Sequence, residues 1–154
     1  MNHSPLQLKH YFFSKASILA QPKGDPAAIN GIETKIDVGR INESPDDYLV
    51  SLTVRLVPLE ENNPCYLGEF VAIGVFAVHP GYPKEGRDKL VGVNGASVLY
   101  GAIREMVANL SARGPWPMLT LVAMNFADDF AEPNPGKSPG KPEAPQLQPV
   151  MPES

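Results

Sequence analysis

Apolar and polar residues alternate with a period of two along much of the first half of the chain. In residues 48–57, five apolar side chains share one face: Tyr48, Val50, Leu52, Val54 and Leu56. Residues 32–38 repeat the pattern with one polar face, and residues 6–19 begin with it before an aromatic block fills both faces. Because successive side chains of a strand point to opposite faces, each of these segments is predicted to be a strand.

A fourth strand is predicted over residues 66–78, which are apolar on both faces except at Glu69. Gly68 and Gly74 inside it indicate a bulge or a close backbone approach. Short turn-rich segments separate these runs, at residues 42–47 and 60–64. Short turns favour hairpins, so the sheet is predicted to be antiparallel.

Helical periodicity begins only after residue 94. Apolar residues then recur at helical spacing through residue 110, with Asn94 or Ser97 as the expected cap. Gly114 stands where a left-handed terminal residue is expected, and Pro115 blocks continuation of the helix. The glycine- and proline-rich residues 79–95 are read as a long loop, a candidate functional crossover.

The segment after the helix is predicted to be extended over residues 116–122. A short second helix is predicted over residues 125–130, capped by Asn125 and ended by Pro133. The predicted fold class is therefore α+β: a four-stranded antiparallel sheet with one long and one short helix. Residues 1–131 are expected to form the folded domain and residues 132–154 a disordered, proline-rich tail.

Composition excludes several classes of function. The net charge of −4 and the absence of any Lys/Arg run longer than one residue argue against nucleic-acid binding. The single cysteine, Cys65, cannot form an intramolecular disulfide. No signal-peptide pattern and no long apolar run occurs, so a cytoplasmic protein without membrane insertion is expected.

The sequence offers no constellation for catalysis. His3, His10 and His79 are scattered, and no pair has the spacing of metal ligands. Neither a nucleophile elbow nor a phosphate-binding glycine loop occurs. We therefore expect no enzyme activity, no metal and no cofactor.

The order and spacing of several short motifs resemble the SecB family of protein-export chaperones. The matches at the helix and its exit are Leu99, Tyr100, Arg104, Glu105, Met106, Val107, Leu110, Arg113, Gly114, Pro117, Leu119, Leu121, Asn125 and Phe126. Leu67, Glu69, Gly74 and Phe76 also match in the preceding strand. The resemblance spans residues 6–130.

The resemblance implies a homotetramer, a dimer of dimers, that binds unfolded client polypeptides in apolar grooves without ATP. It also implies that acidic positions on the sheet contact the translocase motor SecA. Glu69 retains one such position, whereas Lys15 and Leu19 occupy two others. A chaperone for preprotein export and a chaperone dedicated to one client, such as an antitoxin, are therefore both carried forward.

Two sets of residues are candidates for these roles. The candidates for client binding are Phe76, Tyr82, Trp116, Met118, Leu119, Leu121, Phe126 and Phe130. The candidates for the oligomer interface are Leu99, Ile103, Met106, Val107 and Leu110. For both sets the alternative is burial in the core of the single chain.

Overall fold

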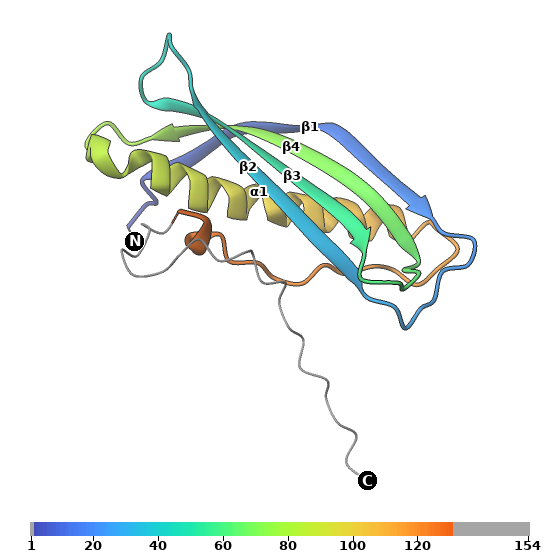
Figure 1. Cartoon of the computed structure of the whole chain (residues 1–154). Coiled ribbons are helices and arrows are strands. Elements are labelled where there is room, and N and C mark those ends of the chain that lie inside the picture. The colour runs from blue at the N-terminus through green and yellow to red at the C-terminus, as the bar shows by residue number, and fades with distance from the viewer. Residues whose placement is uncertain (1, 131–154) are drawn as a thin grey trace, which may run out of the picture.

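Four long strands form one antiparallel sheet in the computed structural model, which describes residues 2–130. They are β1 (Leu6–Ala20), β2 (Asn30–Arg40), β3 (Asp47–Pro58) and β4 (Tyr66–Val78). Their order across the sheet is β1-β4-β3-β2, so β1 and β2 are the two edges (Figure 1). All four predicted strands are confirmed, because each predicted end lies within two residues of the observed one.

The two glycines of β4 allow close approach rather than a bulge in that strand. A Cβ on Gly68 would lie 2.5 Å from the carbonyl oxygen of Ser17, and one on Gly74 would lie 2.8 Å from the ring of Phe76. The register shifts between β1 and β4 fall instead between Leu8 and His10 and between Phe13 and Lys15. The extra residues therefore belong to the edge strand.

The long helix, α1 (Arg87–Ser111), packs across one face of the sheet and contacts all four strands (Figure 1). It begins seven residues before Asn94, after the short η1 (Lys84–Gly86). The prediction of a loop over residues 79–95 therefore holds only for residues 79–83 and is wrong from residue 84 onward, and the predicted cap at Asn94 or Ser97 is wrong. Gly92 and Gly95 suggested a loop, but both are buried helical residues. A Cβ on Gly95 would lie 3.1 Å from Val50, so glycine lets the helix lie close to the sheet.

The end of α1 also differs from the prediction. The helix ends at Ser111, and no glycine within residues 2–130 has a positive φ. Gly114 therefore does not serve as a left-handed terminal residue. A Cβ at Gly114 would overlap the Tyr66 side chain, so the missing side chain makes room for Tyr66.

Beyond the helix, the chain is extended as predicted until η2 (Ala127–Phe130), a single turn that is the last element of the described range. The side chain of Asn125 accepts a hydrogen bond of 3.0 Å from the backbone of Ala127, in agreement with its predicted capping role. The expected proline-rich tail, residues 132–154, lies outside the described residues.

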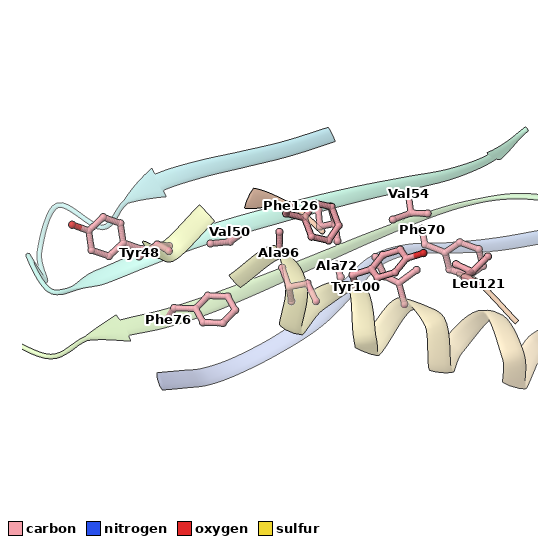
Figure 2. Close-up of a cluster of buried hydrophobic side chains, with 14 of the residues drawn as sticks. Tyr48, Val50, Val54, Phe70, Ala72, Phe76, Ala96, Tyr100, Leu121 and Phe126 are labelled. Atoms are coloured by element: carbon pink, nitrogen blue, oxygen red, sulfur yellow. The ribbon is translucent and has the colours of Figure 1, made fainter. Parts of the chain in front are cut away.

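The core lies between α1 and the helix-facing side of the sheet (Figure 2). The alternating residues of β3 supply Val50, Leu52 and Val54, all without exposed surface. The same alternation turns Leu49, Ser51 and Arg55 to the outer face of the sheet. The period of two therefore sets which face of the sheet receives the helix.

Candidate functional site

The segment that follows α1 runs back along the helix and is held there by side chains of the helix. At one end, the hydroxyl of Ser111 accepts a hydrogen bond of 2.8 Å from the backbone N–H of Leu119. Earlier in α1, the side chain of Arg104 donates a hydrogen bond of 3.0 Å to the carbonyl oxygen of Leu121. Near the start of the helix, the ring of Phe130 fills the space left by Gly92. These contacts fix residues 119–130 antiparallel to α1.

Side chains of residues 118–122 alternate between the core and solvent, as in a strand. Leu121 is buried, with 3% of its surface exposed, while Met118 and Val122 are 57% and 64% exposed. Figure 2 shows Leu121 and Phe126 among the buried side chains of the core. The segment thus turns one apolar row inward and leaves a second apolar row in contact with water.

The backbone of this segment is only partly paired. Within residues 2–130, the N–H groups of Thr120, Val122 and Met124 donate no hydrogen bond. The segment is therefore strand-like in shape but has no partner strand within residues 2–130. Unpaired backbone groups beside exposed apolar side chains can bind another extended chain.

The outer edge of β2 has the same property, because β2 pairs only with β3 within the described residues. Apolar side chains of β2 and of the post-helix segment meet the same core. Those of β2 are the partly buried Ile32, Ile36 and Val38, and those of the segment are Leu119 and Met124. The β2 edge and the segment therefore both pack against this core.

The eight residues predicted to bind client fall into three groups. Phe76, Leu121 and Phe126 are buried in the core, with at most 3% of their surfaces exposed. They take the core alternative, because the helix covers them. Leu119, Phe130, Trp116 and Tyr82 are partly buried, and Met118 is exposed.

The structure does not bring all the accessible members together. Trp116 and Met118 follow the C-terminal end of α1, whereas Tyr82 precedes its N-terminal end. A 25-residue helix is about 37 Å long. Trp116 is also bound to its own chain, because its indole N–H donates 2.9 Å to the carbonyl of Gln21.

The residues predicted for the oligomer interface lie on the sheet-facing side of α1. Leu99, Ile103 and Val107 have no exposed surface in the single chain. Met106 and Leu110 are partly buried and pack against the same core. The core of the single chain therefore accounts for this helical face, and the free face of α1 is formed by other residues, including Val98 and Gly101.

Glu69 lies on the outer face of the sheet, where it is already paired. The ammonium group of Lys15 lies 2.9 Å from its carboxylate. The hydrogen bond from Lys15 lowers the pKa of Glu69, and burial opposes this shift. Leu19, on the same strand as Lys15, is 63% exposed. On this part of the face, the charge of Glu69 is balanced by Lys15, and Leu19 adds exposed apolar surface.

Several residues that position the segment were not identified as site residues from sequence. Tyr100 donates 2.6 Å to the carbonyl of Val122, and burial raises the pKa of its hydroxyl. The hydroxyl of Tyr66 lies 3.1 Å from the carbonyl of Ser111 and accepts 3.0 Å from the backbone N–H of Trp116. Tyr100 and Arg104 lie one and five positions after Leu99. Their place beside the apolar row of the helix is the sequence feature that could have identified them as positioning residues.

Metal and thiol chemistry find little support in the described part of the chain. Residues 2–130 contain no group of three or more His, Cys, Asp or Glu side chains arranged to hold a metal ion. Burial is the main cause of a raised pKa at the Cys65 thiol. A raised pKa reduces the fraction of reactive thiolate.

One further property concerns the helices. In the described range, none has both the length and the apolar character needed to cross a membrane.

Comparison with known proteins gives a consistent result. Residues 14–134 match the family model described as preprotein translocase subunit SecB. A protein-export protein SecB of Alcanivorax borkumensis is 33% identical over 89 residues, which cover 56% of this chain and 55% of that protein. One from Psychrobacter cryohalolentis is 28% identical over 87 residues, or 56% of this chain and 57% of that protein. The chain thus spans just over half the length of these relatives.

A solved structure supports the same fold. It is the SecB-like chaperone of Mycobacterium tuberculosis in complex with a ChAD peptide from an antitoxin. The TM-score is 0.61 at 19% identity, and the match covers 79% of this chain and 88% of that one. The family match extends over most of this chain, and the strand order and helix placement agree with it. This chain is therefore a divergent member of the SecB family.

Proposed function

We propose that this chain is an ATP-independent molecular chaperone, a holdase, that binds extended stretches of non-native polypeptide. The observation that carries the proposal is the strand-like segment 117–124, which exposes Met118 and Val122 and has backbone N–H groups without a partner among residues 2–130. A client strand gains main-chain hydrogen bonds there without any requirement for a particular sequence. The flexible, polarisable side chain of Met118 suits varied clients.

The β2 edge supplies a second backbone without a partner strand in the described range, and its side chains pack against the same core. Ile29, just before β2, is 55% exposed and adds apolar surface at its start. We propose that a client lies between the β2 edge and the post-helix segment. Affinity then comes from apolar burial and from backbone pairing, both of which tolerate changes of sequence.

We further propose that the working form is a homotetramer, a dimer of dimers, in the cytoplasm. Two surfaces of the single chain support subunit contacts. The edge strand β1 exposes Tyr11 and Phe12, which are 45% and 48% exposed. On the free face of α1, Val98 is 46% exposed, and the Cβ position of Gly101 meets nothing within 4 Å. A glycine within a helix is costly, and close approach of a second helix is a physical reason to retain it.

The choice between export and a dedicated client depends on the outer face of the sheet. The named relatives are protein-export proteins, and the chaperone of the solved complex holds an antitoxin peptide. In this chain, Lys15 pairs with Glu69, and Leu19 adds apolar surface. A basic docking partner finds less free negative charge on such a face. The second candidate function is therefore a chaperone dedicated to one client, such as an antitoxin, that does not dock on SecA.

The holdase proposal is tested by the double variant Met118→Ser and Val122→Ser. The assay follows aggregation of several unrelated unfolded proteins by light scattering. Loss of two exposed apolar contacts is expected to weaken protection at least about tenfold, because each such side chain contributes about 1.5–3 kcal/mol when it is buried by a client. The control is Leu49→Ser, on the opposite face of the sheet, which should protect as the wild type does.

Equal protection by the double variant and the wild type would place client binding elsewhere. Absence of protection by the wild-type chain towards every client tested would refute the holdase proposal. The export question has its own measurement: SecA binding by the wild type and by Lys15→Glu with Leu19→Glu. We expect weak or no binding by the wild type and stronger binding by the acidic variant. Tight binding by the wild type would support the export role.

A further inference from the structure

A cavity of about 580 Å³ opens at the end of the molecule where β4 leaves the sheet. Its walls come from the N-terminal residues before and within β1 and from the loop after β4. Three prolines line it (Pro5, Pro80 and Pro83), together with the rings of Tyr82, His79 and His3. Rigid rings therefore make up much of the wall. Such surfaces suit polyproline segments, which bring little conformational entropy to lose on binding.

Buried contacts hold the cavity wall in place. Arg87, only 4% exposed, donates 3.1 Å to the carbonyl of Pro80 and 3.0 Å to that of Tyr82. Its guanidinium also lies 2.8 Å from the carboxylate of Asp46. The backbone N–H of His79 donates 2.8 Å to Pro5, which joins the N-terminal wall to the loop. The cavity is therefore formed before any ligand arrives.

The imidazole of His79 accepts a hydrogen bond from the backbone. Gly81 donates a hydrogen bond of 3.0 Å to its Nδ1 atom. In the neutral ring, the proton then belongs to Nε2, which can donate a hydrogen bond. A polyproline helix has no internal hydrogen bonds, so its carbonyl groups are free to accept one.

The sequence beyond the described residues contains a matching ligand pattern. Pro139, Pro142 and Pro145 follow one another at intervals of three residues, and Pro149 and Pro152 repeat that interval. A polyproline helix has three residues per turn, so prolines at this interval share one face. The spacing is that of segments which dock in aromatic-lined grooves.

The described chain ends near the cavity. Phe130 packs against Gly92, which lies about 8 Å along the helix axis from Arg87. Arg87 in turn bonds the cavity wall. The nine residues from Phe130 to Pro139 can extend about 28 Å in the polyproline conformation. The chain is therefore long enough to reach the cavity.

We propose that residues 139–145 of this same chain dock in the cavity lined by Tyr82, His79 and the three prolines. The interaction is intramolecular, so a weak contact is favoured by the high effective concentration of a tethered segment. This proposal is independent of the holdase proposal, because the cavity lies before the start of α1, whereas the Met118–Val122 row lies along its C-terminal half.

The test compares two full-length chains by NMR. One is the wild type, and the other carries Pro139→Ala, Pro142→Ala and Pro145→Ala, which leaves length and charge unchanged. We expect the backbone amide signals of His79, Gly81 and Tyr82 to differ between the chains and those of Glu33 and Lys35 to coincide. Coinciding signals around the cavity would overturn the proposal.

A synthetic peptide of residues 137–147 gives the second measurement. It should bind the triple variant at least about tenfold more tightly than the wild type, whose own segment competes for the cavity. Adding Tyr82→Ala to the triple variant should weaken peptide binding at least tenfold, while adding Leu59→Ala, just after β3 at the opposite end of the sheet from the cavity, should not. Absence of peptide binding to the triple variant would overturn the proposal. Binding of the peptide only to an added SH3 domain would assign the proline spacing to an outside partner and would equally overturn it.

Discussion

The hydroxyl of Tyr100 donates a hydrogen bond of 2.6 Å to the carbonyl oxygen of Val122. The ring of Tyr100 also packs edge-on against Phe126, with 5.6 Å between the ring centroids. One helical side chain therefore fixes both the backbone and the core-facing ring of the post-helix segment. The hydrogen bond to the carbonyl of Val122 also fixes the backbone from which the exposed side chain of Val122 projects.

This relationship predicts the effect of Tyr100→Phe. Loss of the hydroxyl should lower the free energy of unfolding by about 1 kcal/mol, because the carbonyl of Val122 loses a buried donor. Urea denaturation measures the change. The control is Tyr11→Phe, because the hydroxyl of Tyr11 makes no hydrogen bond within the described chain, and it should change stability by less than about 0.5 kcal/mol. Equal effects of the two changes would contradict a role for the Tyr100 hydroxyl.

Gly92→Ala is predicted to displace the turn η2. The added methyl group would overlap the ring of Phe130, and the ring is the part that can move. The amide signals of Asp128 and Asp129 should therefore shift in an NMR spectrum. Gly101→Ala is the matched change, because nothing lies within 4 Å of its Cβ position, and both changes gain about 1 kcal/mol of helix propensity. Shifts of η2 in both variants would show that helix propensity, not the Phe130 contact, is responsible.

Two aspartate substitutions on α1 should have different outcomes. Val107→Asp places a charge in the core of the single chain and should cost at least about 3 kcal/mol of folding free energy. Val98→Asp adds a charge to the free face, so we expect a folded chain with a smaller assembly mass. Circular dichroism and light scattering measure the two properties. A folded, dissociated Val107→Asp would show that this residue lies at a subunit interface.

The ion pair between Lys15 and Glu69 predicts a pH effect. The pKa of Glu69 is lowered in the folded chain, chiefly by the hydrogen bond from Lys15. Its stabilising contribution is therefore present above the unfolded-state pKa and is lost as the pH falls through the folded-state pKa. Lys15→Gln should raise the pKa of Glu69 toward its ordinary value, measured by NMR titration of the side-chain carboxyl carbon.

The control for this titration is Lys35→Gln. Lys35 lies 3.8 Å from Asp37 on β2, and both side chains are well exposed. Its removal should leave the titration of Glu69 unchanged. An unaltered Glu69 titration in Lys15→Gln would mean that the pair does not persist in solution.

The sequence by itself determined the strands. Alternation at Tyr48–Leu56 predicted β3, and the turns predicted the antiparallel order of the hairpins. These features are local, because one buried face imposes a period of two on neighbouring residues. The apolar helical row at Leu99, Ile103 and Val107 was equally clear, but the same row suits either a core or an interface.

Tertiary structure decided the start of α1 and the position of the site. Gly92 and Gly95 discourage a helix locally, yet contact with Phe130 and Val50 requires residues without side chains there. Packing also buried Phe76, Leu121 and Phe126 and left Met118 and Val122 exposed. Sequence identifies which side chains are apolar. Only the return of the chain along α1 decides which of them the helix covers and which remain in contact with solvent.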